Sequence, residues 1–329
     1  MSEILAGGAV RIGLDMGGTK TDAVALDRDG RIAARARIAT EHGADGAVAT
    51  ALRALEALDR GGAARRPASI GIGVPGQIDG GRVRHAVNLR VTDLDLGGEV
   101  ERATGIPVRV ENDVKAAALG ASALRRGARA DALSEGASRA ADADVIAYLN
   151  LGTGTAAGIV AAGRLWRGAG GAAGEIGHLS IDPAGPVCVC GQRGCIETYT
   201  GGAAIARRWG RGGELPVRDV FDAADAADPH AVALRDGLAR GVAAAVRLLV
   251  LAVDARTIVI GGGLAALGDR LLAVVNAELI PSGAASPFIR SLRLAERIEL
   301  LPPASAAAAV GASLVGRGEP VASSPTLRT

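Results

Sequence analysis

The chain has 329 residues, of which 49% are hydrophobic and 22% are charged, a composition typical of a globular protein long enough for two domains. The net charge of +2, with no basic run or basic-aromatic face, argues against nucleic-acid binding. No signal peptide and no apolar span of about 20 residues is visible, so we expect no membrane insertion and a cytoplasmic protein.

The N-terminal third alternates predicted strands and helices. Three strands are expected within residues 9–38, separated by glycines and by an Arg-Asp-Gly turn. Helical spacing then covers residues 44–60, a buried strand within 67–79 ends in a Pro-Gly turn, and residues 97–124 indicate a helix, a short strand and a second helix. This alternation predicts an α/β fold.

Two later segments lack a clear apolar stripe. Residues 125–144 are small and charged, and we expect a loop or the frayed end of a helix there. Residues 317–329 are rich in Pro and Ser and are expected to be disordered.

The sequence also contains a long-period internal duplication. Leu14–Val24 aligns without a gap with Leu149–Ile159, which places Gly17 on Gly152. The strand that begins at Ser69 resembles a second one that begins at Thr257, and both end in glycine turns. We therefore expect two similar α/β halves rather than a solenoid, whose repeats are much shorter.

The duplicated hairpins carry a predicted phosphate-binding chemistry. In the segment DMGGTK, glycines after a strand let backbone N–H groups approach phosphate oxygens, and an acid can hold Mg²⁺ through water. An ordinary hairpin turn is the alternative, and the sequence does not follow the Walker pattern. The predicted nucleotide-binding residues are Asp15, Gly17, Gly18, Thr19, Lys20, Gly152, Thr153, Gly154, Gly261, Gly262 and Gly263, with Asp15 as the magnesium residue.

A second motif, VENDVKAAALG, brings Asn112 and Asp113 from a buried strand to the start of a helix. One interpretation is a helix N-cap. The other is a general base, because phosphoryl transfer needs little more than positioning, charge neutralisation and a carboxylate that accepts the hydroxyl proton. Asp113 is the predicted base.

All three cysteines of the chain lie within eight residues. Cys188, Cys190 and Cys195, with His178 upstream, supply three thiolates and one imidazole, which is a complete tetrahedral ligand set for zinc. Buried apolar cysteines or a redox thiol group are the alternatives. With all four positions filled by protein, the zinc is predicted to be structural.

Together, the segments DMGGTK, VPG, ENDVKAAALG, LGTG, GEIGHL and CVCGQRGCIE resemble the ROK family (repressors, uncharacterised reading frames and sugar kinases) from about residue 10 to 315. The resemblance implies an actin/hexokinase-like (ribonuclease H-like) fold with an ATP cleft between two domains, and a homodimer or homotetramer. We expect the small domain at residues 1–115, completed by a C-terminal helix at about 304–316, and the large domain at 116–303 with the zinc loop at 178–195.

The same resemblance implies phosphorylation of a hexose, commonly at the 6-hydroxyl, with ATP and Mg²⁺. It places Asp113 on the catalytic base. The implied sugar-binding residues are Gly76, Asn112, Asp113, Glu175, His178 and Glu197. His178 would then use one ring nitrogen for zinc and the other for the sugar.

Two positions depart from the family pattern. Ala156 and Ala157 stand where glycine is common, and their methyl groups would crowd the phosphates or shift the loop. Lys115 stands where Asn is common.

Several functions remain open from the sequence. The first is a glucokinase-type enzyme, and its strongest rival is a kinase for N-acetylglucosamine, N-acetylmannosamine, fructose or allose. Polyphosphate is an alternative donor to ATP. An inactive sugar-binding protein is motivated by Ala156 and Ala157. A transcriptional repressor is disfavoured, since only about ten residues precede the first glycine hairpin and a DNA-binding domain would need more.

Overall fold

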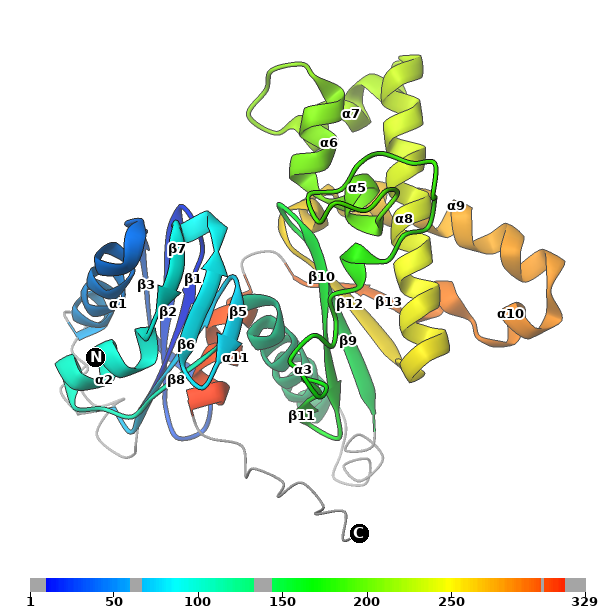
Figure 1. Cartoon of the computed structure of the whole chain (residues 1–329). Coiled ribbons are helices and arrows are strands. Elements are labelled where there is room, and N and C mark those ends of the chain that lie inside the picture. Colours follow the sequence, from blue (N-terminus) through cyan, green and yellow to red (C-terminus); the bar gives the residue numbers. More distant parts are fainter. Residues whose placement is uncertain (1–9, 60–66, 133–143, 303–304, 317–329) are drawn as a thin grey trace, which may run out of the picture. The chain divides into compact units, whose positions relative to one another are not determined.

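The computed structural model describes residues 10–59, 67–132, 144–302 and 305–316. Their contacts divide into two compact units (Figure 1). Unit 1 comprises the described residues within Met1–Arg125 and Ala306–Thr329, and unit 2 those within Arg126–Ser305. The predicted tail at 317–329 lies outside the described residues.

Unit 1 contains a five-stranded sheet in the order β3-β2-β1-β4-β8. β1 pairs antiparallel with β2 and parallel with β4, which pairs parallel with β8. The strands are β1 (Arg11–Met16), β2 (Lys20–Leu26), β3 (Ile32–Ala39), β4 (Ser69–Val74) and β8 (Val108–Asn112). A small second sheet holds β5 (Gln77–Asp79), β6 (Arg82–Ala86) and β7 (Val91–Leu94), with the short 3-10 helix η1 (Val87–Leu89) before β7.

Helices cover both faces of this sheet. The even-numbered positions of β1, such as Leu14, pack with Ala51 of α1 in one apolar cluster, whereas Val24 of β2 packs with Val310 of α11 in another. The alternation follows from the period of two along a strand. The helices of unit 1 are α1 (Gly43–Asp59), α2 (Leu96–Thr104), α3 (Asp113–Ala132, which continues beyond the unit's boundary) and α11 (Ala307–Gly316).

α11 lies against β1, β4 and α3 with backbone almost touching backbone. A Cβ added to Gly13 would overlap the backbone O of Ala309, and one added to Gly71 would overlap that of Ala312. Gly120 of α3 faces Ala307 of α11 in the same way. Glycine is therefore required on both the sheet and α3 for α11 to seat.

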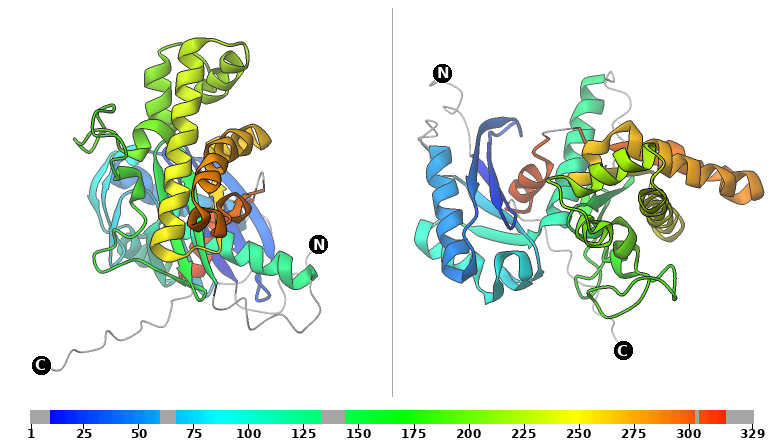
Figure 2. Two further views of the ribbon diagram at one scale, coloured as in Figure 1. Left: turned by 90° about the vertical axis from the view of Figure 1, so that its right-hand side faces the viewer. Right: turned by 90° about the horizontal axis from the view of Figure 1, so that it is seen from above.

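Unit 2 repeats the sheet with the order β11-β10-β9-β12-β13. Its strands are β9 (Val145–Leu151), β10 (Thr155–Ala161), β11 (Arg164–Leu165), β12 (Thr257–Gly261) and β13 (Ile298–Leu300). Leu149 and Ile260 of this sheet pack with Leu238 and Val242 of the long helix α8, which runs past the sheet and on to the smaller helices (Figure 2). The helices are η2 (Ile176–His178), α5 (Ile196–Thr200), α6 (Gly202–Trp209), α7 (Pro216–Asp225), α8 (Pro229–Val253), η3 (Gly263–Leu267), α9 (Asp269–Ala285), α10 (Pro287–Ser291) and η4 (Leu294–Arg297).

The predicted duplication is present, with a correction at the turn. In the parallel pairs, Arg11 lies opposite Ser69 and Ile146 opposite Thr257, as the alignment requires. In the hairpins, however, Met16 pairs with Thr21 and Leu151 with Thr155, so the turn has four residues in unit 1 and three in unit 2. The gapless alignment is therefore wrong after the turn, where Thr21 corresponds to Thr155.

Other expectations compare as follows. The strands and helices expected between residues 10 and 124 are all found. Of the segment 125–144, residues up to Ala132 continue α3, and residues 133–143 lie outside the described residues. The contacts divide the chain after Arg125, ten residues beyond the expected domain boundary. No helix in the described part of the chain is long and apolar enough to cross a membrane.

The tight seat of α11 makes Gly120→Ala a destabilising change. Its methyl group would enter the backbone of α11, which cannot rotate away, and we expect a loss of about 1–3 kcal/mol in the free energy of unfolding. Urea denaturation followed by circular dichroism measures it. Gly127→Ala is the matched control on the same helix, since a Cβ there meets nothing within 4 Å and should stabilise by roughly 0.5–1 kcal/mol. Equal stability of the two variants would contradict the prediction.

Candidate functional site

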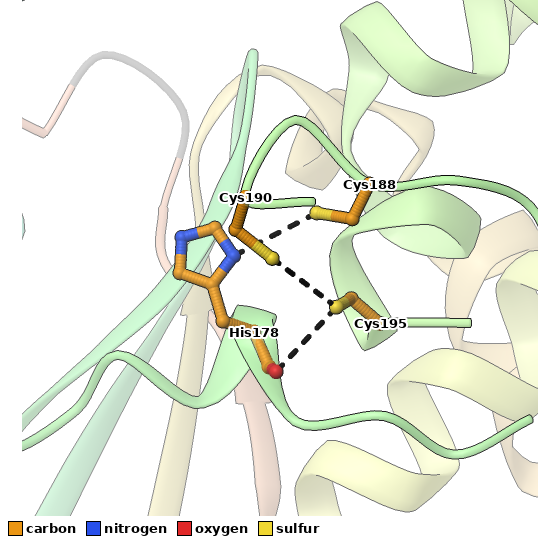
Figure 3. Close-up of side chains that lie close together, drawn as sticks. All are labelled: His178, Cys188, Cys190 and Cys195. Atoms are coloured by element: carbon orange, nitrogen blue, oxygen red, sulfur yellow. Dashed lines mark hydrogen bonds between the residues drawn. The ribbon is translucent and has the colours of Figure 1, made fainter. Parts of the chain in front are cut away.

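The four predicted zinc ligands lie together in unit 2. The Nδ1 of His178 and the three sulfur atoms are all within 4.8 Å of one another, and the three cysteines are free thiols. Figure 3 shows the side chains converging, with the second ring nitrogen of His178 pointing away from the sulfur atoms. The sequence prediction that these residues form one cluster is confirmed.

The spacing of these atoms fits a tetrahedral zinc ion. The two sulfurs of Cys190 and Cys195 are 3.7 Å apart, as are Nδ1 of His178 and the sulfur of Cys188. With Zn–S bonds of about 2.3 Å, tetrahedral sulfur ligands lie about 3.8 Å apart, and a sulfur and a nitrogen ligand about 3.6 Å. Three thiolates and one imidazole are also the donors that zinc prefers in closed structural sites. Two ligand pairs therefore match the spacing for zinc, all four ligand atoms lie within 4.8 Å of one another, and the donor chemistry suits zinc.

The thiols have different affinities for their protons. Burial raises the pKa of Cys195 to about 12, and it also raises that of Cys188. A backbone hydrogen bond at Gln192 lowers the pKa of Cys190 to about 6. A metal ion bound here would have to displace protons from the two buried thiols, which a coordinated divalent cation does.

The loop between the ligands folds back on itself as a narrow ribbon. Ile181 donates its N–H to Gly194 O, and Ser180 Oγ donates to Arg193 O. A Cβ at Gly194 would overlap the backbone of Asp182, and its φ of +64° also favours glycine. The loop is thus closed by backbone contacts in addition to any metal.

A second fastening of this loop is a side-chain contact that the sequence analysis missed. Tyr199 of α5 donates its hydroxyl proton to Asp182 Oδ2 at 2.7 Å, and Arg208 lies over the Tyr199 ring at 5.4 Å. Residues 182 and 199 are distant in sequence and belong to no common motif. No signal in the sequence could have paired them.

The zinc loop leads directly into a predicted sugar-binding acid. Cys195 precedes the first residue of α5, and Glu197 is the second residue of that helix. Glu197 Oε2 accepts the backbone N–H of Thr155 at 2.9 Å. Glu175 precedes the 3-10 helix η2 and His178 is its last residue; η2 is held against β10 because Gly177 lies against the backbone O of Thr155. The three predicted residues therefore extend from segments that meet at the start of β10.

The predicted nucleotide-binding glycines of unit 2 also lie together. Asn150 of β9 pairs with Gly261 of β12, so the turn 152–154 and the glycines 261–263 leave the same edge of the sheet. Gly262 has a φ of +83°, and a Cβ on it would lie 2.5 Å from the carbonyl carbon of Leu151. Close backbone approach at two adjacent strand ends is the geometry that anion and nucleotide sites use.

Unit 1 collects the remaining predicted residues at the equivalent edge of its own sheet. Asn112 Nδ2 donates to Gly76 O at 3.3 Å, while its Oδ1 accepts the N–H groups of Val114 and Lys115. Asn112 is therefore the N-cap of α3, and Asp113 is the first residue of that helix. Gly76 has a φ of +109°, which favours glycine. Asp113 also takes part at the helix N-terminus, since its Oδ1 accepts the N–H of Val114 at 2.9 Å. The N-cap and functional interpretations of this motif are compatible, because a carboxylate that accepts one N–H has further acceptor sites.

The N-terminal hairpin supplies Asp15 and the turn that follows it. Gly17 donates its N–H to Lys20 O, His42 Nε2 contacts Gly18 O at 2.8 Å, and Thr40 donates to Thr19 O. These contacts hold the turn's carbonyl groups, a necessary condition for the turn to present its N–H groups to a ligand.

Asp15 is an acid with an unusual proton affinity. Burial and then the negative charge of Asp113 raise its pKa to about 7. Ionisation of both carboxyl groups at neutral pH is thus disfavoured. A cation bound beside them would favour the ionised form of Asp15. Such a pair at a sheet edge is a feature of functional sites.

The predicted site residues therefore form two groups, one at the strand ends of each unit's sheet. Unit 1 contains Asp15, Gly17, Gly18, Thr19, Lys20, Gly76, Asn112 and Asp113, and unit 2 contains the rest. The duplicated fold with these two strand-end groups defines a protein of the actin/hexokinase-like class.

The sequence matches the ROK family over residues 11–313, and the chain belongs to that family. A glucokinase of Halalkalibacterium halodurans is 35% identical over 285 residues, covering 79% of this chain and 82% of the relative. An N-acetylmannosamine kinase of Citrobacter koseri is 32% identical over 276 residues, covering 80% and 87%. The ROK family glucokinase of Streptomyces griseus, solved with glucose and AMPPNP, has a TM-score of 0.72 and 29% identity, covering 94% of this chain and 99% of that one.

The metal cluster yields a direct prediction. Cys190→Ser removes one ligand whose side chain is exposed, so packing is preserved while the metal site is incomplete. We expect zinc content to fall from about one ion per chain to near zero, with a lower thermal midpoint, because metal binding energy is folding energy. Elemental analysis and thermal melts measure both.

Val189→Ser is the control for this change. Val189 lies between two ligands in the same loop and is 77% exposed, so the substitution alters polarity without touching the cluster. Full zinc content in Cys190→Ser, or equal zinc loss in both variants, would contradict a four-ligand site.

Proposed function

We propose that the protein is an ATP-dependent sugar kinase of glucokinase type, which phosphorylates a hexose, at its 6-hydroxyl, with Asp113 as general base. The supporting observation is the arrangement at the start of α3. Asn112 caps the helix and holds the Gly76 loop, which leaves the Asp113 carboxylate at the carboxyl edge of the parallel strands with Asp15 nearby. Membership of the ROK family, with glucokinase and N-acetylmannosamine kinase relatives, supports sugar phosphorylation as the reaction class.

In this proposal the tasks are divided among the groups, and His178 has two of them. Asp113 accepts the proton of the attacking hydroxyl, and Asn112, Gly76, Glu175, His178 and Glu197 bind the other sugar hydroxyls. The two glycine turns and 261–263 would hold ATP through backbone N–H groups other than those of Gly17 and Gly152, which already donate within their own turns. Asp15 would hold Mg²⁺ through water. Mg²⁺ supplies neutralisation of charge on the phosphates when bound. Zinc, held by His178 and the three cysteines, has a structural task.

The positions of Ala156 and Ala157 weaken the alternative of an inactive sugar-binding protein. Both residues belong to β10, which starts at Thr155, so neither lies in the turn 152–154. Ala157 is 2% exposed and packs in the apolar core with Leu149. Its methyl group supports the sheet rather than crowding a ligand.

The remaining finer assignments stay predictions. They are the choice of glucose over N-acetylmannosamine, N-acetylglucosamine, fructose or allose, ATP over polyphosphate, a homodimer or homotetramer, the domain boundary, and a cytoplasmic location.

A coupled assay against a sugar panel tests the proposal. We expect glucose with ATP and Mg²⁺ to give the highest kcat/KM among the five sugars named above. Polyphosphate is assayed in parallel as the phosphoryl donor. A higher kcat/KM for N-acetylmannosamine would reassign the substrate. No turnover with any sugar and either donor would reject the kinase.

Asp113→Asn tests the mechanism. We expect kcat to fall by about 10²- to 10⁴-fold, the usual contribution of a general base, while the Kd for sugar changes little. A steady-state activity assay measures kcat, and calorimetric titration with glucose measures the Kd.

Asp95→Asn is the matched control, because Asp95 is also an acid at a helix start and accepts the N–H of Gly98 at 3.1 Å. It should change stability little, because Asn caps a helix about as well as Asp, and it should leave kcat unchanged. If Asp113→Asn behaved like Asp95→Asn, with turnover kept, Asp113 would be a structural residue of the helix start only.

A further inference from the structure

Thr155, the first residue of β10, lies between two parts of unit 2, one of which is proposed to bind the sugar and the other the nucleotide. Its backbone N–H reaches Glu197, a proposed sugar-binding acid, and it directly follows the turn 152–154, a proposed phosphate-binding segment. We propose that Thr155 is a positioning residue that couples these two segments, so that sugar and nucleotide strengthen each other's binding. This proposal rests on the proposed function of the same site.

The first contact is between the Glu197 carboxylate and the end of the turn. Oε2 accepts the Thr155 N–H at 2.9 Å. A Cβ on Gly154 would collide with that same oxygen, so the carboxylate occupies the space next to the Gly154 backbone. A displacement of the Glu197 side chain therefore acts on the end of the turn through the hydrogen bond to Thr155.

The second contact fixes Thr155 to the helix that carries Glu197. The Thr155 and Thr200 hydroxyl oxygens are 2.8 Å apart, and both side chains are buried. Thr200 donates its only hydroxyl proton to Ile196 O, so Thr155 must be the donor in the pair. Thr155 thus contacts α5 through both its backbone and its side chain, and these two contacts define its orientation.

Two more bonds hold the rest of the turn. Gly202 donates its N–H to Gly152 O, and Ala203 donates to Thr153 O. The carbonyl groups of the turn are therefore anchored to the segment that follows α5. Only the end of the turn, at Gly154 and Thr155, contacts the carboxylate.

The equivalent hairpin of unit 1 shows which of these contacts belong to the duplicated fold and which are found in unit 2. Thr21 corresponds to Thr155, and its buried hydroxyl lies 2.8 Å from that of Thr40. Thr40 also donates its N–H to the turn, at Thr19 O. Among the described residues, however, no carboxylate accepts a hydrogen bond from Thr21. The hydroxyl pair is thus common to both hairpins, whereas the contact with an acid is particular to unit 2.

A coupling free energy follows from this shared network. Thr155 uses one acceptor site of Glu197, and a carboxylate has about four, so sugar hydroxyls can bind the remaining ones. A sugar that fixes the carboxylate also fixes the end of the turn, so nucleotide pays less to order it, and the reverse holds by linkage.

Calorimetric titration of glucose with and without saturating AMPPNP measures the coupling in the full chain. We expect AMPPNP to tighten glucose binding by about fivefold or more in the natural sequence, within the usual range for coupled sites. Thr155→Val keeps the shape and the N–H but removes the hydroxyl that orients it, and should bring this ratio to less than about twofold. Thr155→Ser should restore it, since it keeps the hydroxyl.

Thr21→Val is the matched control, with the same chemical change in the equivalent hairpin. It should leave the ratio of the two glucose affinities unchanged, although it can weaken nucleotide binding. An unchanged ratio in Thr155→Val, or an equal loss in Thr21→Val, would overturn the proposal. Should Thr155→Val fail to fold, Thr200→Val breaks the same hydrogen bond from its other side.

Hydrogen exchange without ligands keeps this test separate from that of the function. Thr155→Val should raise amide exchange in the turn 152–154 and in α5 together, and Thr21→Val in neither. If the natural protein bound no glucose, the proposed function would fail while the exchange data still decided whether Thr155 couples these segments. Increased exchange confined to the turn would refute the coupling.

Discussion

The structure depends on one strand pairing that occurs in both units. The first strand of each glycine hairpin pairs in parallel with a strand that comes after the hairpin in the chain. The pairing occurs as β1 with β4 and as β9 with β12, in the same register. Because parallel strands end at one edge, each hairpin turn is brought next to the loop of its parallel neighbour. Glycine makes that proximity possible, as at Gly262, where any side chain would enter the backbone of Leu151.

The zinc loop solves a different problem, because it has few apolar residues to bury. Leu179, Val187 and Val189 are exposed, so the loop cannot fold on a core of its own. Its described contacts are the cluster of His178 and the three cysteines at one end and the hydrogen bond from Tyr199 to Asp182 at the other. Since Cys195 directly precedes α5, a metal bound by the cluster would also fix the start of the helix that carries Glu197. Under the proposed function, such a metal would act on the geometry of the sugar site without taking part in the chemistry.

The sequence allowed the elements and the clusters to be predicted where the signal is local. The strands near residues 10–39, the helix start at Asp113 and the ligand set of Cys188, Cys190 and Cys195 each depend on spacing within a short segment. Spacing also revealed the duplication, because the two parallel strand pairs preserve their register.

The missed features arise from contacts between distant segments. The turn before Thr21 has four residues and the turn before Thr155 has three. Packing decides the length of such a glycine turn, so two similar sequences could not reveal the difference. The hydrogen bond from Thr155 to Glu197 crosses 42 positions of sequence and uses a backbone N–H, which no residue type marks. Asp182 and Tyr199 are likewise ordinary residues until the loop folds.

The two halves share a scaffold and differ in where they place their acids, and this difference suits them to different tasks. In unit 1, burial and then the negative charge of Asp113 raise the pKa of Asp15 to about 7, so that Asp15 keeps its proton more readily than an ordinary carboxyl group. A cation near Asp15 would favour loss of that proton. In unit 2, Glu197 instead spends one acceptor site on the backbone of the hairpin. The two equivalent turns thus differ in the position of one carboxylate, and under the proposed function this difference would separate a proton-accepting edge from a binding edge.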